Sequence, residues 1–374
     1  MPPATPIATP TSGPKCACDD LVGATVEGTQ KPGSWHVVEK IVRSKGASGG
    51  NFSVGYRVRH DDGTEAFMKA TDLALLAQNS NMPLVDRIQH ATYQYQFERD
   101  VLLLCRGNNL DKIVLAMDHG EFTTVFNGAQ DVVFYLIFEM ADGDATVQSD
   151  VSTRLDYVWS FNAMWNLAIA VQQLHTTEVS HNDIKPSNVL RYNVDLQKLG
   201  DLGRAVAQTR SGPFDSIAYP GDRTYRPPEH LYRRSTSASA LTSFDSRKAT
   251  DLYLLGSVSY FFLTGQMITP VVLSHLRNDH LPQNWNGEFD DVLPYWRDAF
   301  ARALMSLESE APKDSVGKST VESGELITAV TQLCEPDPAK RGHPLNRRGQ
   351  SDKFGVDRYI ALFDKLRRRM GLRN

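Results

Sequence analysis

The sequence contains little cysteine, which excludes a fold held by disulfide bonds. Its 374 residues include only Cys16, Cys18, Cys105 and Cys334. Four scattered thiols cannot form a disulfide framework, so we expect a protein of a reducing compartment, the cytoplasm. Cys16 and Cys18 are close in sequence, but no second pair of cysteines or histidines follows at zinc-ligand spacing, which favours inert thiols.

Long apolar runs are also missing. The two longest, residues 132–138 and 252–263, are shorter than the roughly 20 residues that a bilayer-spanning helix needs. Residues 1–14 have neither the charged start nor the apolar centre of a signal peptide. We therefore expect no membrane span.

An excess of one charge sign is absent as well. The chain has 40 Lys and Arg against 44 Asp and Glu, a formal net charge of −4. A dedicated nucleic-acid-binding protein carries a positive field that releases counterions from the phosphate backbone. The charge balance argues against that class, and we expect no nucleic-acid partner.

Strand patterns come first along the chain. Residues 35–42, 52–60 and 66–70 predict strands, and the glycine-rich or Asp-Gly turns between them indicate an antiparallel meander. A helix is predicted over residues 89–104, followed by strands at 113–117 and 132–138. Beyond residue 141 the apolar spacing becomes helical, for example over 252–264. This order predicts an α+β chain with two unlike lobes.

These patterns divide the chain into four segments. Five of the first fourteen residues are proline, so we expect a disordered Pro/Thr-rich tail over residues 1–33. A sheet-rich first lobe covers 34–141 and a helical second lobe covers 142–345. Residues 346–374 are predicted to form an amphipathic helix with a basic end, which favours a helix docked on the body over a membrane or nucleic-acid patch.

Residues 181–188 (HNDIKPSN) and 201–203 (DLG) carry the clearest chemical signal. Phosphoryl transfer from ATP needs a carboxylate that orients the attacking hydroxyl and accepts its proton. It also needs a second carboxylate and an amide oxygen that hold magnesium on the phosphates. Asp183, Asp201 and Asn188 supply these three groups.

In these residues the chain resembles the eukaryotic-type (Hanks-type) serine/threonine protein kinase family. The resemblance runs from Trp35 to Pro344. It implies a two-lobed fold, with a small antiparallel sheet and one main helix in the N-lobe and a larger, mostly helical C-lobe. It also implies transfer of the γ-phosphoryl group of ATP, with Mg²⁺, to Ser/Thr hydroxyls of protein substrates. Asp183 would then be the catalytic base with Lys185 beside it, and Asn188 and Asp201 would bind the metal.

The same resemblance implies a set of nucleotide-binding residues. Lys69 is similar to the lysine that anchors the phosphates, and Phe67 stands where a small adenine-contacting residue is usual. Glu139 and Ala141 correspond to the hinge that meets the adenine edge, and Leu190 to the floor of the adenine pocket. The residues similar to the glycine-rich loop are Ser48, Gly49, Gly50, Asn51, Phe52 and Ser53.

The carboxylate partner of Lys69 has two candidates. Asp100 occupies the place of the family's glutamate, and Glu98 is the alternative. On a helix the two side chains lie about 200° apart, so only one of them faces the cleft. Asp100 is four residues before Leu104, which we expect to continue the inward face, and this favours Asp100.

Further elements of the family follow in order. Residues 225–229 (YRPPE) resemble the segment whose glutamate, here Glu229, pairs with an arginine, here Arg341. Asp251 is similar to the aspartate that anchors the catalytic loop from a buried helix. Residues 231–250 are longer than the usual link and rich in Ser and Thr, so we expect a mobile surface loop there.

Two departures bear on regulation. Asn182 replaces the arginine that receives a phosphate from the activation loop, so we predict activity that does not require loop phosphorylation. Asp222 replaces a threonine that hydrogen-bonds the catalytic residues, and its carboxylate is expected to contact Lys185 instead. Arg204, Arg210, Arg223 and Arg226 offer an alternative phosphate pocket.

Three functions remain open at this point. The first is an active Ser/Thr protein kinase, which is favoured because Lys69, Asp183, Asn188 and Asp201 are all present. The second is a pseudokinase or scaffold that binds nucleotide without efficient transfer. The third is a small-molecule kinase, against which stand Lys185 and the Glu229–Arg341 pair.

Overall fold

The structure is a computed structural model that describes residues 16–41, 53–72, 83–146, 157–193, 195–234, 238–313, 317, 320–349 and 352–371. Residues 48–52 of the predicted glycine-rich loop lie outside them. The chain divides into two compact units. Unit 1 comprises Met1–Thr92 and Ala116–Met140, and unit 2 comprises Tyr93–Leu115 and Ala141–Asn374.

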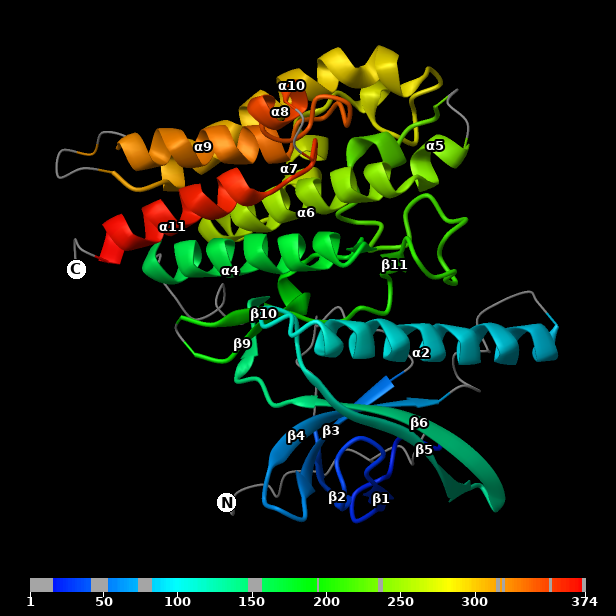
Figure 1. Ribbon diagram of the computed structural model, residues 1–374. Coiled ribbons are helices and arrows are strands. Elements are labelled where there is room, and N and C mark those ends of the chain that lie inside the picture. The colour runs from blue at the N-terminus through cyan, green and yellow to red at the C-terminus, as the bar shows by residue number, and fades with distance from the viewer. Residues whose placement is uncertain are drawn as a thin grey trace, which may run out of the picture. The chain divides into compact units, whose positions relative to one another are not determined.

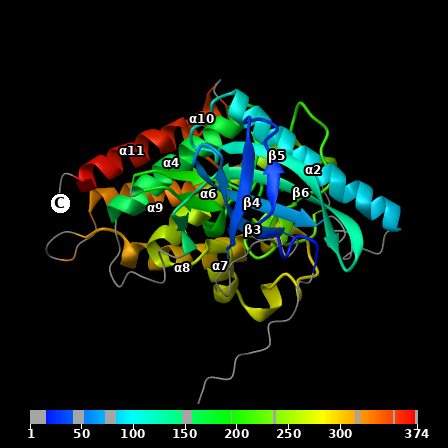
Figure 2. The same cartoon turned by 90° about the horizontal axis from the view of Figure 1, so that it is seen from below.

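Unit 1 contains an antiparallel sheet of six strands in the order β1-β2-β3-β4-β6-β5 (Figures 1 and 2). The strands are β1 (Thr25–Glu27), β2 (Ser34–Lys40), β3 (Ser53–His60), β4 (Glu65–Asp72), β5 (Ala116–Phe126) and β6 (Ala129–Glu139). Period-two alternation sets the faces of β4, because Ala66, Met68 and Ala70 are buried whereas Phe67 and Lys69 are only partly buried.

The N-terminal part of unit 1 is folded, which corrects the predicted tail. Cys16, Cys18 and Leu21 pack into the same core as Trp35, and β1 pairs with β2. The Tyr56 hydroxyl donates to the Cys18 carbonyl at 2.6 Å. The proline-rich composition ends at residue 14, and the next segment brings enough apolar side chains to join the sheet. The expectation of a tail over 1–33 was therefore wrong for residues 16–33, and residues 1–15 lie outside the described part.

Helix α2 (Leu84–Gly107) crosses the boundary between the units and extends beyond the predicted helix at both ends. In the part that belongs to unit 2, the buried residues recur at helical spacing. They are Tyr95, Phe97, Glu98, Val101, Leu102 and Cys105. Beyond this helix, Ile113 forms a single bridge with Leu199, and β5 begins only at Ala116, so the strand predicted at 113–117 is displaced.

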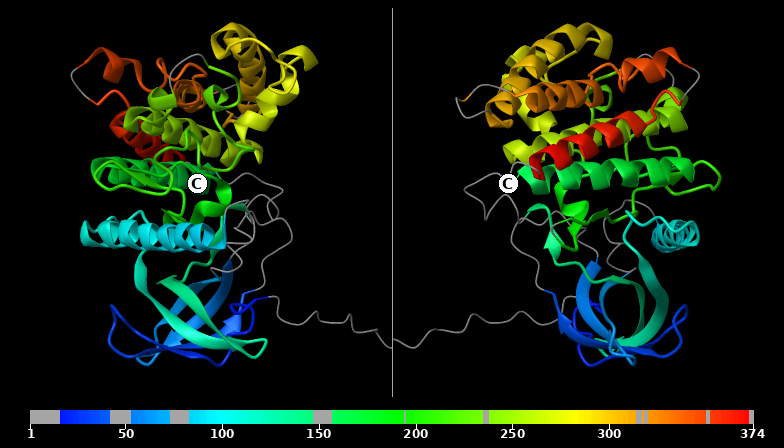
Figure 3. Two further views of the ribbon diagram at one scale, coloured as in Figure 1. Left: turned by 90° about the vertical axis from the view of Figure 1, so that its right-hand side faces the viewer. Right: turned by 60° about the vertical axis from the view of Figure 1, so that its left-hand side comes forward.

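Unit 2 is mainly helical. Its α-helices beyond α2 are α4 (Tyr157–Thr176), α5 (Ala238–Thr242), α6 (Phe244–Thr264), α7 (Ile268–His275), α8 (Phe289–Glu310), α9 (Val321–Leu333), α10 (Pro344–Arg348) and α11 (Asp357–Gly371). Helix α4 packs against α6 on one side and against α11 on another (Figures 1 and 3). Residues Tyr359, Phe363 and Leu366 form the buried face of α11, and Arg367 near its basic end lies 4.0 Å from the Trp165 ring centroid.

Short elements of unit 2 carry the loops of interest. The strands are β7 (Gly143–Asp144), β8 (Val179–Ser180), β9 (Val189–Arg191), β10 (Gln197–Leu199) and β11 (Val206–Ala207). The 3-10 helices are η1 (Pro186–Asn188), η2 (Pro228–His230) and η3 (Asn278–His280). Antiparallel pairing joins β9 to β10 and β8 to β11.

The segment 231–250 is largely helical in its described part, so the mobile loop predicted there is corrected. It contains α5 and the first turns of α6, and Ser243 caps α6 by accepting the Ser246 N–H at 3.2 Å. Arg247 and Lys248 are buried and have polar partners: Arg247 Nη2 contacts three backbone carbonyls, and Lys248 pairs with Asp352. Nε and Nη1 of Arg247 have no acceptor among the described residues. Serine and threonine are common both in loops and at helix N-caps such as Ser243, so composition alone does not distinguish the two.

Among the described residues, no single helix has the length and apolar content of a membrane span. The bent pair of α6 and α7, which meet at 82°, does so together by length and composition alone.

Candidate active site

Asp251 of α6 anchors the loop 181–188 through hydrogen bonds to the start of the loop. The Asp251 carboxylate accepts the backbone N–H groups of His181 at 2.9 Å and Asn182 at 2.7 Å, and the Ser180 hydroxyl at 2.8 Å. His175 contacts the same carboxylate. Burial opposes ionisation of Asp251, but these hydrogen bonds outweigh it and lower its pKa. Asp251 thus has the anchoring position that its sequence context predicted.

This anchoring allows a rare backbone conformation. Asn182 has a φ of 62°, in the left-handed region that non-glycine residues seldom adopt. Next to it, His181 joins two loops, because its Nε2 contacts the Gly200 carbonyl at 3.0 Å while the Asp183 N–H donates to its Nδ1 at 3.2 Å. The two contacts are compatible with one neutral tautomer, protonated at Nε2. The loop is therefore fixed on both sides of Asp183.

Asp183 is buried, and polar groups surround its carboxylate. Oδ1 accepts the backbone N–H of Asp222 at 2.8 Å. Oδ2 lies 3.1 Å from Lys185 Nζ and 3.4 Å from Asn188 Nδ2. Lys185 Nζ also lies 3.5 Å from Asp222 Oδ2, which is the contact expected from the sequence. Three groups, from Lys185, Asn188 and Asp222, thus converge on the carboxylate of Asp183.

Burial raises the pKa of Asp183, and the nearby Asp201 adds to this, whereas Lys185 acts against it. For Lys185, burial favours the neutral amine, but Asp183 and Asp222 prevail and its pKa is raised. The Asp183 carboxyl is therefore more basic than an exposed one, and the adjacent Lys185 favours its charged form.

The hairpin β9–β10 brings Asn188 and Asp201 to one end of the same ribbon. Val189 pairs with Leu199 in register, and the Gly200 N–H donates to the Asn188 carbonyl at 2.9 Å. The Asn188 amide nitrogen donates to the Asp183 carbonyl at 2.8 Å, so its side-chain oxygen is left as the ligand atom. Asp201 is exposed and has a φ of 60°.

These donors fit magnesium. Mg²⁺ takes oxygen ligands, keeps several waters and is usually bound through one or two carboxylates together with substrate phosphates. An exposed carboxylate and an oriented amide oxygen meet that requirement without a full protein cage. The predicted metal ligands are thus chemically suited to the ion, and their use remains a prediction.

Helix α2 presents Glu98, not Asp100, on its buried face. Asp100 is about one-third exposed and pairs with Arg99 at 2.8 Å and with Arg210. Glu98 is buried, and its carboxylate lies 3.3 Å from where a Cβ would stand on Gly203 of the DLG segment. These positions favour Glu98 over Asp100 as the partner of Lys69, and that pairing stays a prediction. The expectation that Leu104 continues the inward face is not met, since Val101, Leu102 and Cys105 are the more deeply buried positions.

The segment between Asp201 and Glu229 is fixed by residues that the sequence reasoning did not single out. Arg247 of α6 is buried and donates to the carbonyls of Phe214, Asp215 and Ile217 at 2.9–3.0 Å. The Tyr93 hydroxyl donates to the Ser211 carbonyl at 2.8 Å. Arg247 precedes Asp251 by one helical turn, so the two share a face of α6. That four-residue spacing was the sequence signal from which the position of Arg247 could have been predicted.

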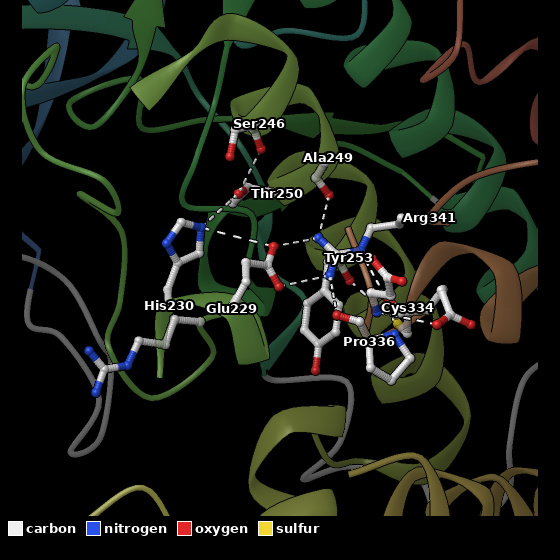
Figure 4. A network of polar contacts seen from close by, with 12 residues as sticks. Glu229, His230, Ser246, Ala249, Thr250, Tyr253, Cys334, Pro336 and Arg341 are labelled. Atoms are coloured by element: carbon white, nitrogen blue, oxygen red, sulfur yellow. Dashed lines mark hydrogen bonds and ion pairs between the residues drawn. The ribbon is translucent and has the colours of Figure 1, made fainter. Parts of the chain in front are cut away.

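The predicted Glu229–Arg341 pair is present and completely buried. Arg341 Nη1 and Nη2 donate to the two oxygens of Glu229 at 2.7 and 2.9 Å, a bidentate arrangement that Figure 4 shows. Arg341 also donates to the carbonyls of Ala249, Glu335 and Pro336. Because nearly every donor of the guanidinium has an acceptor, the pair ties η2 to α6 and to the segment before α10.

His230 extends this network on its other side. Its ring stacks on Tyr219 with centroids 5.3 Å apart. Its Nε2 lies 3.2 Å from the Thr250 hydroxyl, a contact that Figure 4 shows. Burial lowers the pKa of His230 to about 4; Glu229 opposes the shift, and the nearby arginines add to it. His230 is therefore neutral at physiological pH.

The remaining predicted nucleotide-binding residues divide between the units. In unit 1, Lys69 on β4 lies opposite Gly55 and Leu136 in the sheet register, and Glu139 ends β6. Ser53 begins β3. In unit 2, Ala141 directly follows the last residue of unit 1, Met140, and Leu190 on β9 pairs with Lys198.

Phe67 has a structural explanation in unit 1. A Cβ added to Gly55 would lie 2.7 Å from the Phe67 ring, so the ring occupies the space that a side chain at residue 55 would need. Phe67 also faces Phe138, with ring centroids 6.5 Å apart. The bulky residue at 67 is thus compensated by the absence of one at 55.

Comparison with known proteins shows which family has these features. The family model described as "Protein kinase domain" matches residues 50–345. The serine/threonine-protein kinase DCLK2 of Mus musculus is 26% identical over 71% of this chain and 32% of its own length. The Aurora/IPL1-related protein kinase 2 of Caenorhabditis elegans is 29% identical over 46% of this chain and 50% of its own length.

The chain covers a larger share of a third relative than of the first two. The extracellular signal-regulated kinase 2 of Dictyostelium discoideum is 26% identical over 69% of this chain and 67% of its own length. By contrast, the chain spans only about a third or less of the first relatives, including the mouse protein. The family match, together with a sheet-containing unit and a mostly helical unit, confirms the predicted α+β kinase-like fold. The chain belongs to the protein kinase family, of the Hanks type that these serine/threonine kinases represent.

Proposed function

We propose that the chain is an active protein kinase that transfers the γ-phosphoryl group of Mg-ATP to Ser or Thr hydroxyls of protein substrates. The observation that carries this proposal is the environment of Asp183. A buried carboxylate of raised pKa, flanked by Lys185 and Asn188, is suited to hold a hydroxyl and accept its proton.

The reaction follows from these positions. The substrate hydroxyl donates a hydrogen bond to the Asp183 carboxylate, which orients the oxygen toward the γ-phosphorus. As the new bond between that oxygen and phosphorus forms, the bond from the γ-phosphorus to the bridging oxygen breaks and its electron pair leaves with ADP. The hydroxyl proton passes to Asp183. Lys185, 3.1 Å from Oδ2, keeps the carboxylate ionised beforehand and contributes positive charge beside the transferred group.

Asn188 and Asp201 would hold magnesium. Magnesium bound there would supply neutralisation of the phosphate charge. The Asn188 amide nitrogen, donating to the Asp183 carbonyl at 2.8 Å, keeps its oxygen oriented for this role. His181, through its contact with the Gly200 carbonyl, fixes the turn that carries Asp201.

Nucleotide binding is assigned to the residues named from the sequence, with one revision. Lys69 would hold the α- and β-phosphates, and we propose Glu98, in place of Asp100, as the carboxylate that pairs with it. The glycine-rich residues 48–53 would cover the phosphates, with the backbone at Glu139 and Ala141 and the side chain of Leu190 against the adenine. The division into an N-lobe over 34–141 and a C-lobe over 142–345, and a cytoplasmic location, belong to the same proposal.

The test starts with the purified chain, magnesium, labelled ATP and a generic protein substrate such as casein. Phosphosites are mapped by mass spectrometry. Asp183→Asn should lower kcat by several orders of magnitude with nucleotide still bound, because positioning and charge supply most of the catalysis. Lys69→Met should lower transfer similarly and weaken ATP binding. Transfer by either variant at close to the wild-type rate would contradict the assignment.

The metal role has its own measurement. ATP should raise the melting temperature far more with magnesium than with EDTA, because a ligand that binds only the folded state stabilises it. Asn188→Leu should reduce that difference. Equal shifts in both buffers, with activity that survives chelation, would exclude the metal. Nucleotide binding without transfer would favour the pseudokinase, and transfer to sugars or amines but not to proteins would favour the small-molecule kinase.

A further inference from the structure

The activation segment, residues 201–229, contains two arginines, Arg223 and Arg226, whose role is not explained by contacts within the segment. The other arginines named there are in use, since Arg204 lies 5.0 Å from the Phe214 ring centroid and Arg210 pairs with Asp100. Arg223 is exposed and Arg226 is half-buried. Within the described part of the chain, neither has a carboxylate partner, and Arg226 Nε is shielded from solvent without any hydrogen-bond acceptor.

The two guanidinium groups lie close enough to affect each other. Burial lowers the pKa of Arg226, and the charge of Arg223 lowers it further. Two neighbouring cations without a carboxylate between them repel, and a buried N–H without an acceptor costs free energy. An anion bound beside the two groups would offset their repulsion, since a guanidinium presents several donors in a fixed planar fork.

The position of the pair connects it to the acceptor site. The Asp222 N–H donates to Asp183 Oδ1, and the Tyr225 N–H donates to the Asp222 carbonyl at 3.1 Å, so a tight turn carries Arg223 and Arg226 beside the catalytic carboxylate. The carboxylate of Asp222 itself is occupied by Lys185 and by the Thr224 N–H. Asp222 therefore makes its contacts with groups other than the two arginines.

We propose that Arg223 and Arg226 select protein substrates that carry an acidic side chain, carboxylate or phosphorylated, within a few residues of the accepting hydroxyl. An extended peptide advances about 3.3 Å per residue, so a side chain two to four residues from the acceptor spans the distance between a carboxylate and a turn that contacts it. This inference rests on the proposed kinase function and adds a substrate class to it. A phosphate on the chain's own loop is the competing occupant, but residues 211–217 are already held by Arg247 and Tyr93.

The test uses four serine peptides of equal length that carry Asp, phosphoserine, Asn or Ala at positions flanking the acceptor. The first measurement is kcat/KM for each peptide, and the second is the affinity of fluorescein-labelled copies by anisotropy. We expect the Asp and phosphoserine peptides to exceed the Asn peptide by roughly tenfold or more, mainly through KM, since charge-assisted hydrogen bonds give discrimination of that order. The advantage should shrink as salt is raised.

The variants Arg223→Ala and Arg226→Ala should each reduce the ratio between the Asp and Asn peptides. The control is Arg302→Ala, which removes the same charge from the exposed Arg302–Asp298 pair of α8 and should leave the ratio unchanged. Equal rates and affinities for the Asp and Asn peptides in the wild type would overturn the proposal. So would a ratio that survives both substitutions.

Two further outcomes separate this inference from its alternatives. If phosphatase treatment of the kinase creates the acidic preference, and mass spectrometry finds the removed phosphate on residues 201–229, the pair serves the chain's own loop and the substrate assignment is wrong. If no peptide is phosphorylated but the Asp peptide still binds through Arg223 and Arg226, the acidic recognition stands and the kinase function fails. If all four peptides are phosphorylated at equal rates, the kinase function stands and the acidic recognition fails.

Discussion

The backbone N–H of Asp222 donates a 2.8 Å hydrogen bond to Oδ1 of Asp183, so the segment before Glu229 directly contacts the carboxylate proposed as the catalytic base. The close approach depends on the preceding residue, Gly221. A Cβ added there would lie 2.1 Å from the Asn182 carbonyl oxygen, a distance at which one of the two backbones must move. Gly221 therefore sets how near this segment comes to the catalytic loop.

We predict that Gly221→Ala lowers kcat by about 100-fold with a folded protein, because a displacement of about 1 Å at a catalytic group costs that much. The matched control is Gly324→Ala in α9, where an added Cβ would meet nothing within 4 Å. The measurement is kcat on a saturating peptide, with circular dichroism as the check of folding. A variant at residue 221 as active as the control variant would show that the segment tolerates the shift.

A second prediction concerns the helix carboxylates. Glu98→Gln should reduce kcat/KM strongly, whereas Asp100→Asn should have a mild effect, because Glu98 is the buried group beside Gly203 and Asp100 pairs with exposed Arg210. Steady-state kinetics with varied ATP give both values. If Asp100→Asn were the more damaging change, the assignment made from the sequence would be restored.

The third prediction is that activity does not depend on phosphorylation of the activation segment. Asn182 carries no charge that could receive a phosphate, and Arg247 already holds the carbonyls of Phe214, Asp215 and Ile217 from α6. Protein treated with phosphatase, and verified by mass spectrometry, should keep its initial rate within about tenfold, since the contacts of Arg247 with the segment require no phosphate.

Arg247→Met provides the contrast for this prediction, because it removes the three hydrogen bonds without touching a phosphorylation site. It should lower the rate more than phosphatase does. A large loss on phosphatase treatment that autophosphorylation restores would show that the segment is a phosphorylation switch and that Arg247 is not sufficient.

Local patterns predicted what depends on local sequence. The strands around Lys69, the helix of Glu98 and the catalytic loop were found because period-two and 3.6-residue patterns and short motifs carry them. The choice between Asp100 and Glu98 could not be made from local patterns, because the two differ by two residues and only packing shows that Val101, Leu102 and Cys105 are the buried neighbours.

Long-range contacts were out of reach of such patterns. Cys18 joins the core of unit 1 through Tyr56, which is 38 residues away, so composition alone assigned it to a tail. Arg247 reaches carbonyls about 30 residues earlier, and nothing in the Ser/Thr-rich composition of 231–250 shows that a buried arginine is stabilised there. Pairs such as Glu229 and Arg341 were found only because a family motif marks both ends.

A fourth prediction uses the lowered pKa of His230, about 4 in the folded protein. The unfolded chain takes up the proton near pH 6.5, so between these values it binds more protons than the folded state, and stability falls as pH is lowered from about 6.5 to about 4. The free energy of unfolding of the wild type, relative to His230→Gln, should drop by about 2 kcal/mol between pH 7.5 and pH 5.

Urea unfolding at the two pH values measures this difference. The surface variant His36→Gln, which removes an exposed histidine paired with Asp61, controls for general acid effects. A difference between wild type and His230→Gln that is independent of pH would mean that His230 titrates near its ordinary pKa in the folded protein.

The last prediction concerns the buried pair of Glu229 and Arg341. Burial opposes the charge on Glu229, but the adjacent guanidinium outweighs it and lowers the pKa of Glu229. Such a pair is weak evidence for net stability, because desolvating two ions offsets much of their attraction. Breaking it is different, since Glu229→Gln leaves the Arg341 charge buried without a counter-ion while the carbonyls of Ala249, Glu335 and Pro336 still hold it in place. We expect a loss of about 3–5 kcal/mol in the free energy of unfolding.

The comparison that isolates this effect has two controls. Asp298→Asn breaks the exposed pair with Arg302 and should change the free energy of unfolding by less than about 1 kcal/mol. The double variant Glu229→Met with Arg341→Met removes both charges, and it should be more stable than Glu229→Gln, because no unpaired ion remains in the core. If the double variant were the less stable of the two, the pair itself would be a net source of stability, and the hydrogen bonds that join η2 to α6 would account for more of the fold than the charges do.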